Sequence, residues 1–307
     1  MFDTVAIKHA LTWIPTEEYL LSLGWRPRYS MFDGTIYAFT LNQQKSSVEP
    51  HLTIALTPQK QWHLKAEASL PKLLHGVNVP LLDESEIASS IRLMCASVEK
   101  CIGRPFDPAT ALVCRMDCAQ DIHIEGGSVL PVIAKFQKVQ IPRYDRTPHN
   151  DTSVVFTPKG ENKSKRISIY DKYAEVIQRN GTDTEKHNAR GIARLEVGLR
   201  TKAITYLTEK LELPNREAQH ILTREVADFV LRDALQKFQF DSIGQSTNEN
   251  IERLINHFGT SRAKSLLGFL EIKSQFGEDL YKYEELKYPR RTYFRDLADC
   301  RRAGVLP

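Results

Sequence analysis

The pattern of apolar residues changes near residue 200, and this change constrains the fold more than any other feature of the sequence. Before that point, short segments alternate apolar and polar side chains with the two-residue period of a strand, over residues 4–9, 35–41, 51–56, 62–68, 111–124, 153–157, 166–170 and 192–199. After Thr201 nearly every segment has helical periodicity. The sequence therefore predicts an α+β fold, in which an N-terminal antiparallel-sheet domain with packed helices is followed by an all-helical C-terminal region.

The chain of 307 residues is long enough for two units of ordinary size. We expect a sheet-based domain over 1–200, a helical connector over 201–245, and a helical region over 246–307. Residues 239–249 are the best linker candidate because they are polar and include a glycine and two serines. Helices are expected over 16–23, 84–102, 129–139, 215–238, 251–258 and 261–276, and residues 142–150 are expected to form a loop.

Composition restricts the class of protein. Hydrophobic residues make up 41% of the chain and charged residues 26%, which is typical of a globular protein, and no apolar run is long enough to span a bilayer. The first residues alternate like a strand and lack a signal-peptide pattern, so we expect a cytoplasmic protein. The five cysteines have no paired Cys-x-x-Cys spacing, which favours reduced, structural thiols. The net charge of +4 is compatible with a polyanionic partner.

Residues 165–173, Lys-Arg-Ile-Ser-Ile-Tyr-Asp-Lys-Tyr, place two tyrosines where a strand gives way to a helix. A tyrosine hydroxyl with a pKa of about 10 is a weak nucleophile near neutral pH, so attack on a phosphodiester needs a neighbouring base or cation. We predict Tyr170 and Lys172 as catalytic residues, with Lys172 contacting the phosphate and Lys165 and Arg166 adding positive charge. The alternative is that Tyr170 and Tyr173 are half-buried aromatic residues without a chemical role.

Two predicted strands carry carboxylates at positions that a buried strand rarely tolerates. Alternation puts Arg115, Asp117 and Asp121 on one face of the first strand, and Arg194 and Glu196 on one face of the second. If the strands are neighbours, Asp117 and Glu196 are suited to hold Mg²⁺ or Mn²⁺, with Asp121 as a third candidate, while Arg115 and Arg194 steady a phosphate. The alternative is a set of arginine–carboxylate salt bridges.

A basic segment near the C-terminus predicts one more helix. Residues 289–304 begin with proline, contain Arg290, Arg291 and Arg295, and end at a glycine. Such a helix is suited to enter a major groove as the recognition element of a helix-turn-helix. The alternative is a solvated basic face on a packing helix.

Several catalytic classes are excluded by missing motifs. No two of the nine histidines are separated by a single residue, so the His-x-His pair of many tyrosine nickases is missing. The sequence also contains no Walker loop and no Gly-x-Gly-x-x-Gly fingerprint, which argues against ATP-driven unwinding and dinucleotide chemistry.

Five segments, in the same order and spacing, resemble the replication initiators of filamentous phages, the gene II type of rolling-circle nickase. They are residues 1–7, residues 68–79 (Ala-Ser-Leu-Pro-Lys-Leu-Leu-His-Gly-Val-Asn-Val), residues 115–117 (Arg-Met-Asp), residues 169–172 (Ile-Tyr-Asp-Lys) and residues 194–196 (Arg-Leu-Glu). The resemblance covers roughly residues 1–200. Val77 departs from it, because a histidine is usual at that position.

The resemblance implies a nick in the plus strand of a double-stranded origin by Tyr170, followed by rejoining of the displaced strand, with metal ligands at Asp117 and Glu196. It implies origin DNA and single-stranded plus-strand DNA as partners, together with a host helicase and polymerase in the host bacterial cytoplasm. A second hypothesis is a non-catalytic, sequence-specific DNA-binding regulator of a phage or plasmid. A third, a structural protein without a nucleic-acid partner, leaves the C-terminal arginines unexplained.

Overall fold

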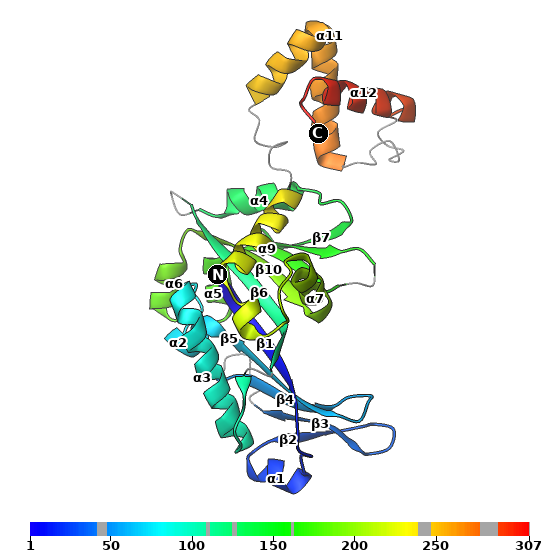
Figure 1. Cartoon of the computed structure of the whole chain (residues 1–307). Helices are drawn as coiled ribbons and strands as arrows, with labels where there is room; N and C mark the ends of the chain where they lie inside the picture. Colours follow the sequence, from blue (N-terminus) through cyan, green and yellow to red (C-terminus); the bar gives the residue numbers. More distant parts are fainter. Residues whose placement is uncertain are drawn as a thin grey trace.

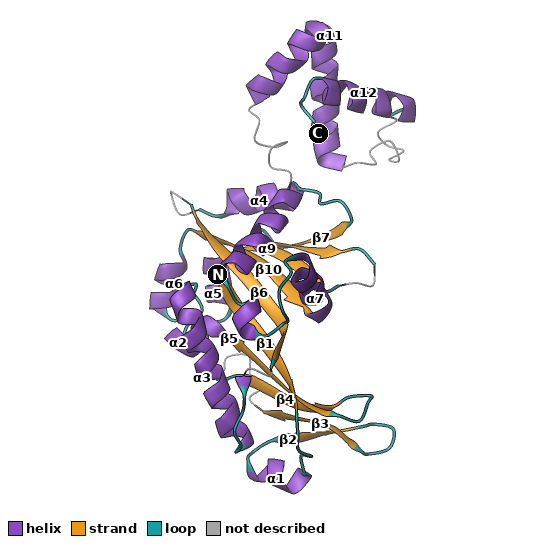
Figure 2. Cartoon of the chain, in the orientation of Figure 1, coloured by secondary structure: helices purple, strands orange, loops and turns teal. Residues whose placement is uncertain are grey.

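The computed structural model describes residues 1–41, 48–108, 111–124, 128–160, 163–238, 247–276 and 288–306. Its centre is a 10-stranded sheet in the order β2-β3-β4-β5-β1-β6-β10-β9-β8-β7, and every neighbouring pair is antiparallel (Figures 1 and 2). The predicted mixed architecture with a large antiparallel sheet is confirmed. The strands are β1 Phe2–Ala10, β2 Arg26–Tyr29, β3 Ile36–Leu41, β4 His51–Leu56, β5 Trp62–Ser69, β6 Leu112–His123, β7 Tyr144–His149, β8 Ser153–Pro158, β9 Lys165–Asp171 and β10 Ile192–Arg200.

The last strand in sequence lies near the middle of the sheet. β10 pairs with β6 on one side and with β9 on the other. All but two of its nine residues are buried, which fits a central strand covered on both faces. Residues that are far apart in sequence therefore meet along β10.

One large apolar core joins one face of the sheet to several helices. Buried side chains of α3 Glu84–Ile102, α4 Leu130–Lys138, α7 Thr201–Lys210, α8 Ala218–Ile221 and α9 Arg224–Lys237 belong to the same cluster as Leu195, Val197 and Leu199 of β10. Helix α3 begins with a capping box between Asp83 and Glu86 and ends at Gly103, whose φ of 63° suits a glycine. The helices of residues 201–237 thus pack directly on β6 and β10.

Smaller helices lie elsewhere on the sheet. Helix α1 Glu17–Ser22 follows β1, and α2 Leu70–His75 follows β5 directly. Helices α5 Lys172–Gln178 and α6 Asp183–Ala189 pack on each other and enclose a separate small cluster of Val79, Val176 and Ala189.

Two predictions of local structure are wrong. Residues 142–150 were expected to form a loop, but β7 pairs with β8 as an edge strand, where the ladder tolerates Pro148 on its open side. Residues 215–238 were expected to form one helix, but α8 ends before Thr223, whose side chain caps the new helix α9 by accepting from the Val226 N–H. Most of the expected linker at 239–249 lies outside the described residues.

After α9, the described chain consists of α11 Thr247–Phe276 and α12 Arg290–Arg302 (Figure 1). Gly259 interrupts α11 with a non-helical conformation, at the break expected between residues 258 and 261. Among the described helices, none is both long enough and apolar enough to cross a bilayer.

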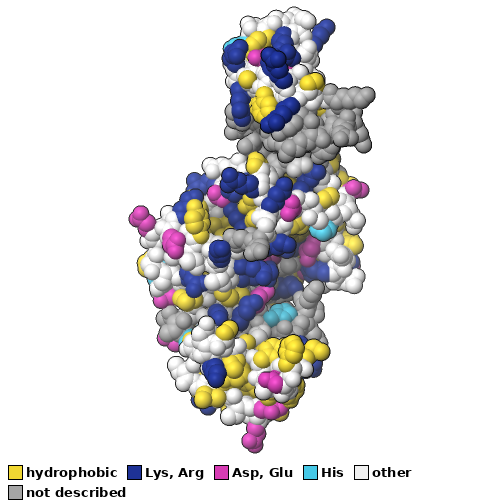
Figure 3. Space-filling model, turned by 90° about the vertical axis from the view of Figure 1, so that its right-hand side faces the viewer, with side chains coloured by type: hydrophobic (Ala, Val, Ile, Leu, Met, Phe, Trp, Pro, Cys, Tyr) yellow, Lys and Arg dark blue, Asp and Glu magenta, His cyan; other side chains and the backbone are white. Residues whose placement is uncertain are grey.

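The surface is unevenly charged. On the face drawn in Figure 3, Lys and Arg side chains gather around a hollow near the middle of the molecule, with acidic side chains among them. The described cysteines are all unpaired thiols, as the sequence predicted.

Candidate functional site

The end of β9 positions Tyr170. Asp171 stops the strand and caps α5, because its carboxylate accepts the backbone N–H groups of Tyr173 at 2.9 Å and Ala174 at 3.3 Å. The strand-to-helix change expected from the sequence is therefore made by the residue that follows Tyr170. This fixes Tyr170 at the end of the ladder, opposite Arg194 of β10.

A charged face lies opposite the apolar core. Because strand side chains alternate, the core residues Leu195, Val197 and Leu199 leave Arg194, Glu196 and Gly198 on the other face. The register then brings the neighbouring strands to that face as cross-strand partners, namely Tyr170, Ser168 and Arg166 from β9, and Asp121, Ala119 and Asp117 from β6. The predicted site residues of three separate strands thus share one face, which we call the polar face.

The Tyr170 hydroxyl contacts the carboxylate of Glu196. Tyr170 donates to Glu196 Oε2 at 3.3 Å, and Arg166 donates to Oε1 of the same carboxylate at 3.0 Å. Burial and the nearby Glu196 charge raise the pKa of Tyr170 well above its usual value. Burial, with the charges of Asp117 and Asp3, raises the pKa of Glu196 to about 6. At neutral pH the pair is therefore a protonated phenol that donates to an ionised carboxylate.

Asp117 is held beside Glu196 by an arginine. Arg115 donates to both carboxylate oxygens, at 3.3 Å and 2.5 Å, and also contacts Glu67 of β5. Burial raises the pKa of Asp117, although Arg115 opposes this shift. Gly198 leaves the room that the carboxylate occupies, since a β-carbon there would lie 3.0 Å from Asp117 Oδ1.

Arg194, predicted to contact DNA, is instead buried. Its side chain has no exposed surface, and its guanidinium donates to both oxygens of Asp121, at 2.6 Å and 2.9 Å. It also donates to the backbone carbonyls of Asn78 and Val79, at 3.0 Å and 2.5 Å. Arg194 therefore anchors the segment after α2 over the polar face. Asp121 is engaged in the ion pair that the sequence left open as an alternative to metal binding.

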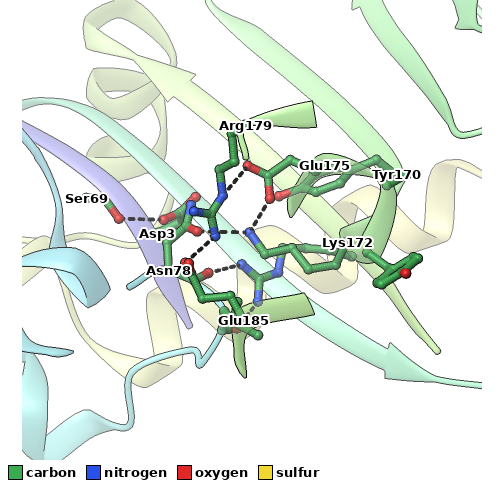
Figure 4. Close-up of polar contacts among 12 residues, drawn as sticks. Asp3, Ser69, Asn78, Tyr170, Lys172, Glu175, Arg179 and Glu185 are labelled. Carbon is green, nitrogen blue, oxygen red and sulfur yellow. Dashed lines mark hydrogen bonds and ion pairs between the residues drawn. The ribbon is translucent and has the colours of Figure 1, made fainter. Parts of the chain in front are cut away.

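Lys172 is also buried, whereas the sequence favoured a phosphate contact. Its ammonium lies 2.9 Å from Glu175 Oε2 and donates to Asn78 Oδ1 at 3.3 Å, and it lies 6.0 Å from the centre of the Tyr170 ring (Figure 4). Burial and the charge of Arg194 lower its pKa. Lys172 is therefore held by Glu175 and Asn78 next to the Tyr170 ring.

The other predicted DNA contacts separate into two groups. Arg166 and Arg115 lie on the polar face, with side chains that are 48% and 29% exposed. Lys165 points the other way and pairs with Asp233 of α9 at 2.7 Å. Arg290, Arg291 and Arg295 belong to α12 and are not part of the polar face.

The carboxylates on the polar face suit a cation such as Mg²⁺, which keeps several of its water ligands and needs only one or two carboxylates. Across the residues that the structure describes, no three His, Cys, Asp or Glu side chains come together as a ready metal site. Asp3 of β1, however, is 8% exposed and adds to the negative charge that raises the pKa of Glu196. Sequence analysis missed Asp3, although a carboxylate within an apolar strand is the same signal that singled out Asp117 and Glu196.

The sequence supports the family that these motifs suggested. The family model for the N-terminal region of the phage replication-associated protein, the gene II protein, matches residues 38–216. The chain belongs to this family. The expected resemblance to gene II type replication initiators is confirmed, and binding to DNA follows from that role.

The family match includes most of the site and excludes the C-terminal helices. It spans β6, β9 and β10, and so contains Tyr170, Glu196 and Asp117. It ends before α9, α11 and α12. The family assignment therefore concerns the sheet and its polar face.

Other comparisons add little to the family assignment. A solved structure described as a rolling circle replication initiator protein from Geobacillus stearothermophilus is 9% identical, with coverage of 78% of this chain and 84% of that chain and a TM-score of 0.35. That likeness is too weak to support a functional argument. A search of curated proteins found no match.

Proposed function

We propose that the chain is the nicking and rejoining enzyme of rolling-circle replication, with Tyr170 as its nucleophile. The observation that carries the proposal is the contact between the Tyr170 hydroxyl and Glu196, on a face that also holds Asp117 and two partly exposed arginines. A phenol with a raised pKa needs a base in contact with it, and Glu196 meets that need. Membership in a replication-associated family supports DNA as the substrate.

The chemical step exchanges one phosphodiester for another. The Tyr170 oxygen forms a bond to phosphorus as the bond from phosphorus to the 3′ oxygen breaks. Glu196 takes the phenolic proton, and the leaving 3′ oxygen takes a proton from solvent. The products are a 5′-phosphotyrosyl strand and a free 3′-OH, which primes synthesis by a host polymerase. Attack by a later 3′-OH on the phosphotyrosine reverses the step and closes the displaced strand into a circle. Because the chain has no Walker loop, strand separation falls to a host helicase.

Asp117 and Glu196 are the residues that would hold Mg²⁺ or Mn²⁺, and only one of the two Glu196 oxygens, Oε2, faces the Tyr170 hydroxyl. Mg²⁺ usually keeps several waters and uses one or two protein carboxylates together with substrate phosphate oxygens, so two carboxylates suffice. The repulsion that raises the pKa of Glu196 marks a place where positive charge is favourable. When bound, the cation would polarise the phosphate and offset charge on the leaving oxygen. Asp121, our third candidate, would first have to leave Arg194.

Gly198→Ala is expected to lower cleavage on the order of tenfold, because small displacements of catalytic groups are costly. The new methyl group would lie 3.0 Å from Asp117 Oδ1 and force that carboxylate to shift. Initial rates on an origin oligonucleotide at several Mg²⁺ concentrations measure the effect. Gly268→Ala is the matched control, since a β-carbon there meets nothing within 4 Å. Equal rates for both variants and the wild type would show that Asp117 placement is unimportant.

Glu196→Gln is expected to abolish the base and to stabilise the metal-free fold above pH 6. The folded-state pKa of about 6 lies above the ordinary value of 4.5, so between these two pH values the folded protein binds more protons than the unfolded chain. Stability is therefore lost as pH rises through that window, by about 2 kcal/mol in total. Urea unfolding in EDTA at pH 4 and pH 7.5 measures it.

Glu185→Gln is the contrasting control for that experiment. Glu185 pairs with Arg179 at 2.6 Å and caps α6. Burial opposes its ionisation, but hydrogen bonds from Arg179 and Thr182 leave its pKa lowered. Its neutralisation should therefore destabilise the protein at pH 7.5. If Glu196→Gln also destabilises the protein at pH 7.5, the folded state does not disfavour the charged form of Glu196.

A covalent intermediate provides the direct test of the proposed function. The purified chain, a 5′-labelled and 3′-labelled pair of single-stranded oligonucleotides carrying the cognate nick sequence, and Mg²⁺ should yield an adduct with only the strand 3′ of the nick. Mass spectrometry of the digested adduct should place the phosphate on Tyr170. An adduct at another tyrosine would overturn the assignment of Tyr170, and DNA binding without any nick would favour the non-catalytic regulator.

A further inference from the structure

Helices α11 and α12 share an apolar core of their own. Leu254, Ala263 and Phe269 of α11 pack with Tyr293 and Cys300 of α12. Within the described chain, this cluster has no member in common with the core beneath the sheet. The two helices are therefore held together without help from the polar face.

The charges of α12 are sorted between its two sides. Tyr293, Asp296, Leu297 and Cys300 form the buried side. Every arginine of the helix is exposed, but only Arg291, Arg295 and Arg302 lie opposite the buried side, and Arg290 and Arg301 flank it. With 100° per residue, Arg291, Arg295 and Arg302 fall within one narrow stripe along the helix. The outer side of α12 is thus strongly cationic.

The acidic residues of α12 are directed inward. Asp296 is buried and accepts from Arg262 at 2.6 Å and from the Tyr288 hydroxyl at 2.5 Å. Asp299 also accepts from Arg262, at 2.6 Å. Arg295 and Arg302 lie 3.2 Å and 3.8 Å from these carboxylates, yet their side chains remain 62% and 68% exposed. Arg262 of α11 therefore pairs with both acidic residues of α12. Arg295 and Arg302 remain accessible to a polyanion.

We propose that the exposed arginine side of α12 binds the phosphate backbone of duplex DNA by lying in its major groove. The 13-residue helix is about 20 Å long and about 10–12 Å wide with side chains, which matches a groove about 12 Å wide. Three arginines on the outer side, Arg291, Arg295 and Arg302, fit the charge of the groove walls. The choice of DNA as the polyanion rests on the proposed function, whereas the cationic side itself does not.

The test is a triple variant of the full chain, Arg291→Gln, Arg295→Gln and Arg302→Gln. Glutamine keeps helix propensity, and all three positions are exposed, so the fold should persist. We expect duplex affinity to fall at least tenfold at low salt, and the slope of log K against log salt to shrink by about 2.7, because each lost phosphate contact removes about 0.9. Fluorescence anisotropy with a labelled duplex at four salt concentrations measures both.

The matched control removes the same charge elsewhere, by Arg92→Gln, Lys100→Gln and Arg224→Gln on α3 and α9. The proposal predicts a nearly unchanged salt slope for this control. Equal slopes for the two triple variants would overturn it. Equal affinity of the wild type for duplex DNA and duplex RNA, lost equally in the α12 variant, would also overturn the groove assignment, because the deep and narrow RNA major groove does not admit a helix.

Cleavage of a single-stranded oligonucleotide separates this inference from the proposed function. The α12 variant should cleave it at the wild-type rate, since α12 contributes nothing to the polar face. If the wild type fails to cleave while the α12 variant still loses duplex affinity, the nickase proposal fails and the DNA-binding proposal stands. If cleavage and duplex binding are both intact in the α12 variant, the helix has no role in DNA binding.

Discussion

Tyr170→Phe is expected to lower strand cleavage at least a thousandfold, as loss of an essential nucleophile does in other covalent enzymes. The substitution removes only the hydroxyl that contacts Glu196 at 3.3 Å and keeps the ring against Lys172. Duplex affinity and the unfolding midpoint should change little, because one partly buried hydrogen bond contributes about 1 kcal/mol. Single-turnover cleavage of an origin oligonucleotide, quantified on a denaturing gel, measures the loss.

Tyr173→Phe is the matched control for that prediction. Tyr173 lies three residues further on, in α5. The guanidinium carbon of Arg190 lies over its ring, 5.5 Å from the ring centre. Glu196 instead receives its phenolic hydrogen bond from Tyr170, so the Tyr173 hydroxyl should be dispensable for cleavage. Full activity in Tyr170→Phe, or loss of activity only in Tyr173→Phe, would move the nucleophile away from the polar face.

Arg194→Met is expected to destabilise the fold by about 3–5 kcal/mol, the usual loss when one partner of a buried ion pair is removed. The change removes the hydrogen-bond donor of Asp121 and of the Asn78 and Val79 backbone carbonyls, where water has little access. The released segment after α2 also bears on Lys172 through Asn78. Urea unfolding should therefore show a large loss of stability, accompanied by slower cleavage.

The matched arginine for this comparison is Arg166, which lies on the same face and pairs with Glu196 while being 48% exposed. Arg166→Met should cost clearly less than Arg194→Met, because the half-exposed Arg166 makes one hydrogen bond to Glu196 and its loss leaves no backbone carbonyl unpaired. The double variant Arg194→Met with Asp121→Leu should recover part of the loss, since no unpaired buried charge remains. Similar unfolding midpoints for Arg194→Met and Arg166→Met would contradict the anchoring role of Arg194.

Alternation in the sequence predicted which side chains share a face, because the two-residue period of a strand is local. It placed Asp117 and Asp121 together, and Arg194 with Glu196, as the structure does. Asp3 is also a carboxylate within an apolar strand, and the sequence analysis missed it. Edge strand β7 was also missed, since its polar residues and Pro148 are typical of a loop, and only its pairing with β8 makes it a strand.

Burial was the part that the sequence did not predict. Arg194 was expected at a phosphate because it neighbours Glu196 on a strand, and Lys172 because it neighbours Tyr170, yet both side chains have no exposed surface. Apart from Glu175, which pairs with Lys172 within α5, their partners are Asn78, Val79 and Asp121, which are distant in sequence. No local pattern reports such contacts, because they depend on how the segment after α2 folds back over the sheet.

The central place of β10 also has a consequence for synthesis on the ribosome. β9 supplies Tyr170 and β6 supplies Asp117, but both must wait for residues 192–200 before they are joined in one ladder. Glu196, the proposed proton acceptor, arrives with that same strand. An emerging chain that has folded only as far as β9 therefore carries Tyr170 without its proposed base, so the proposed cleavage has to wait until β10 is in place.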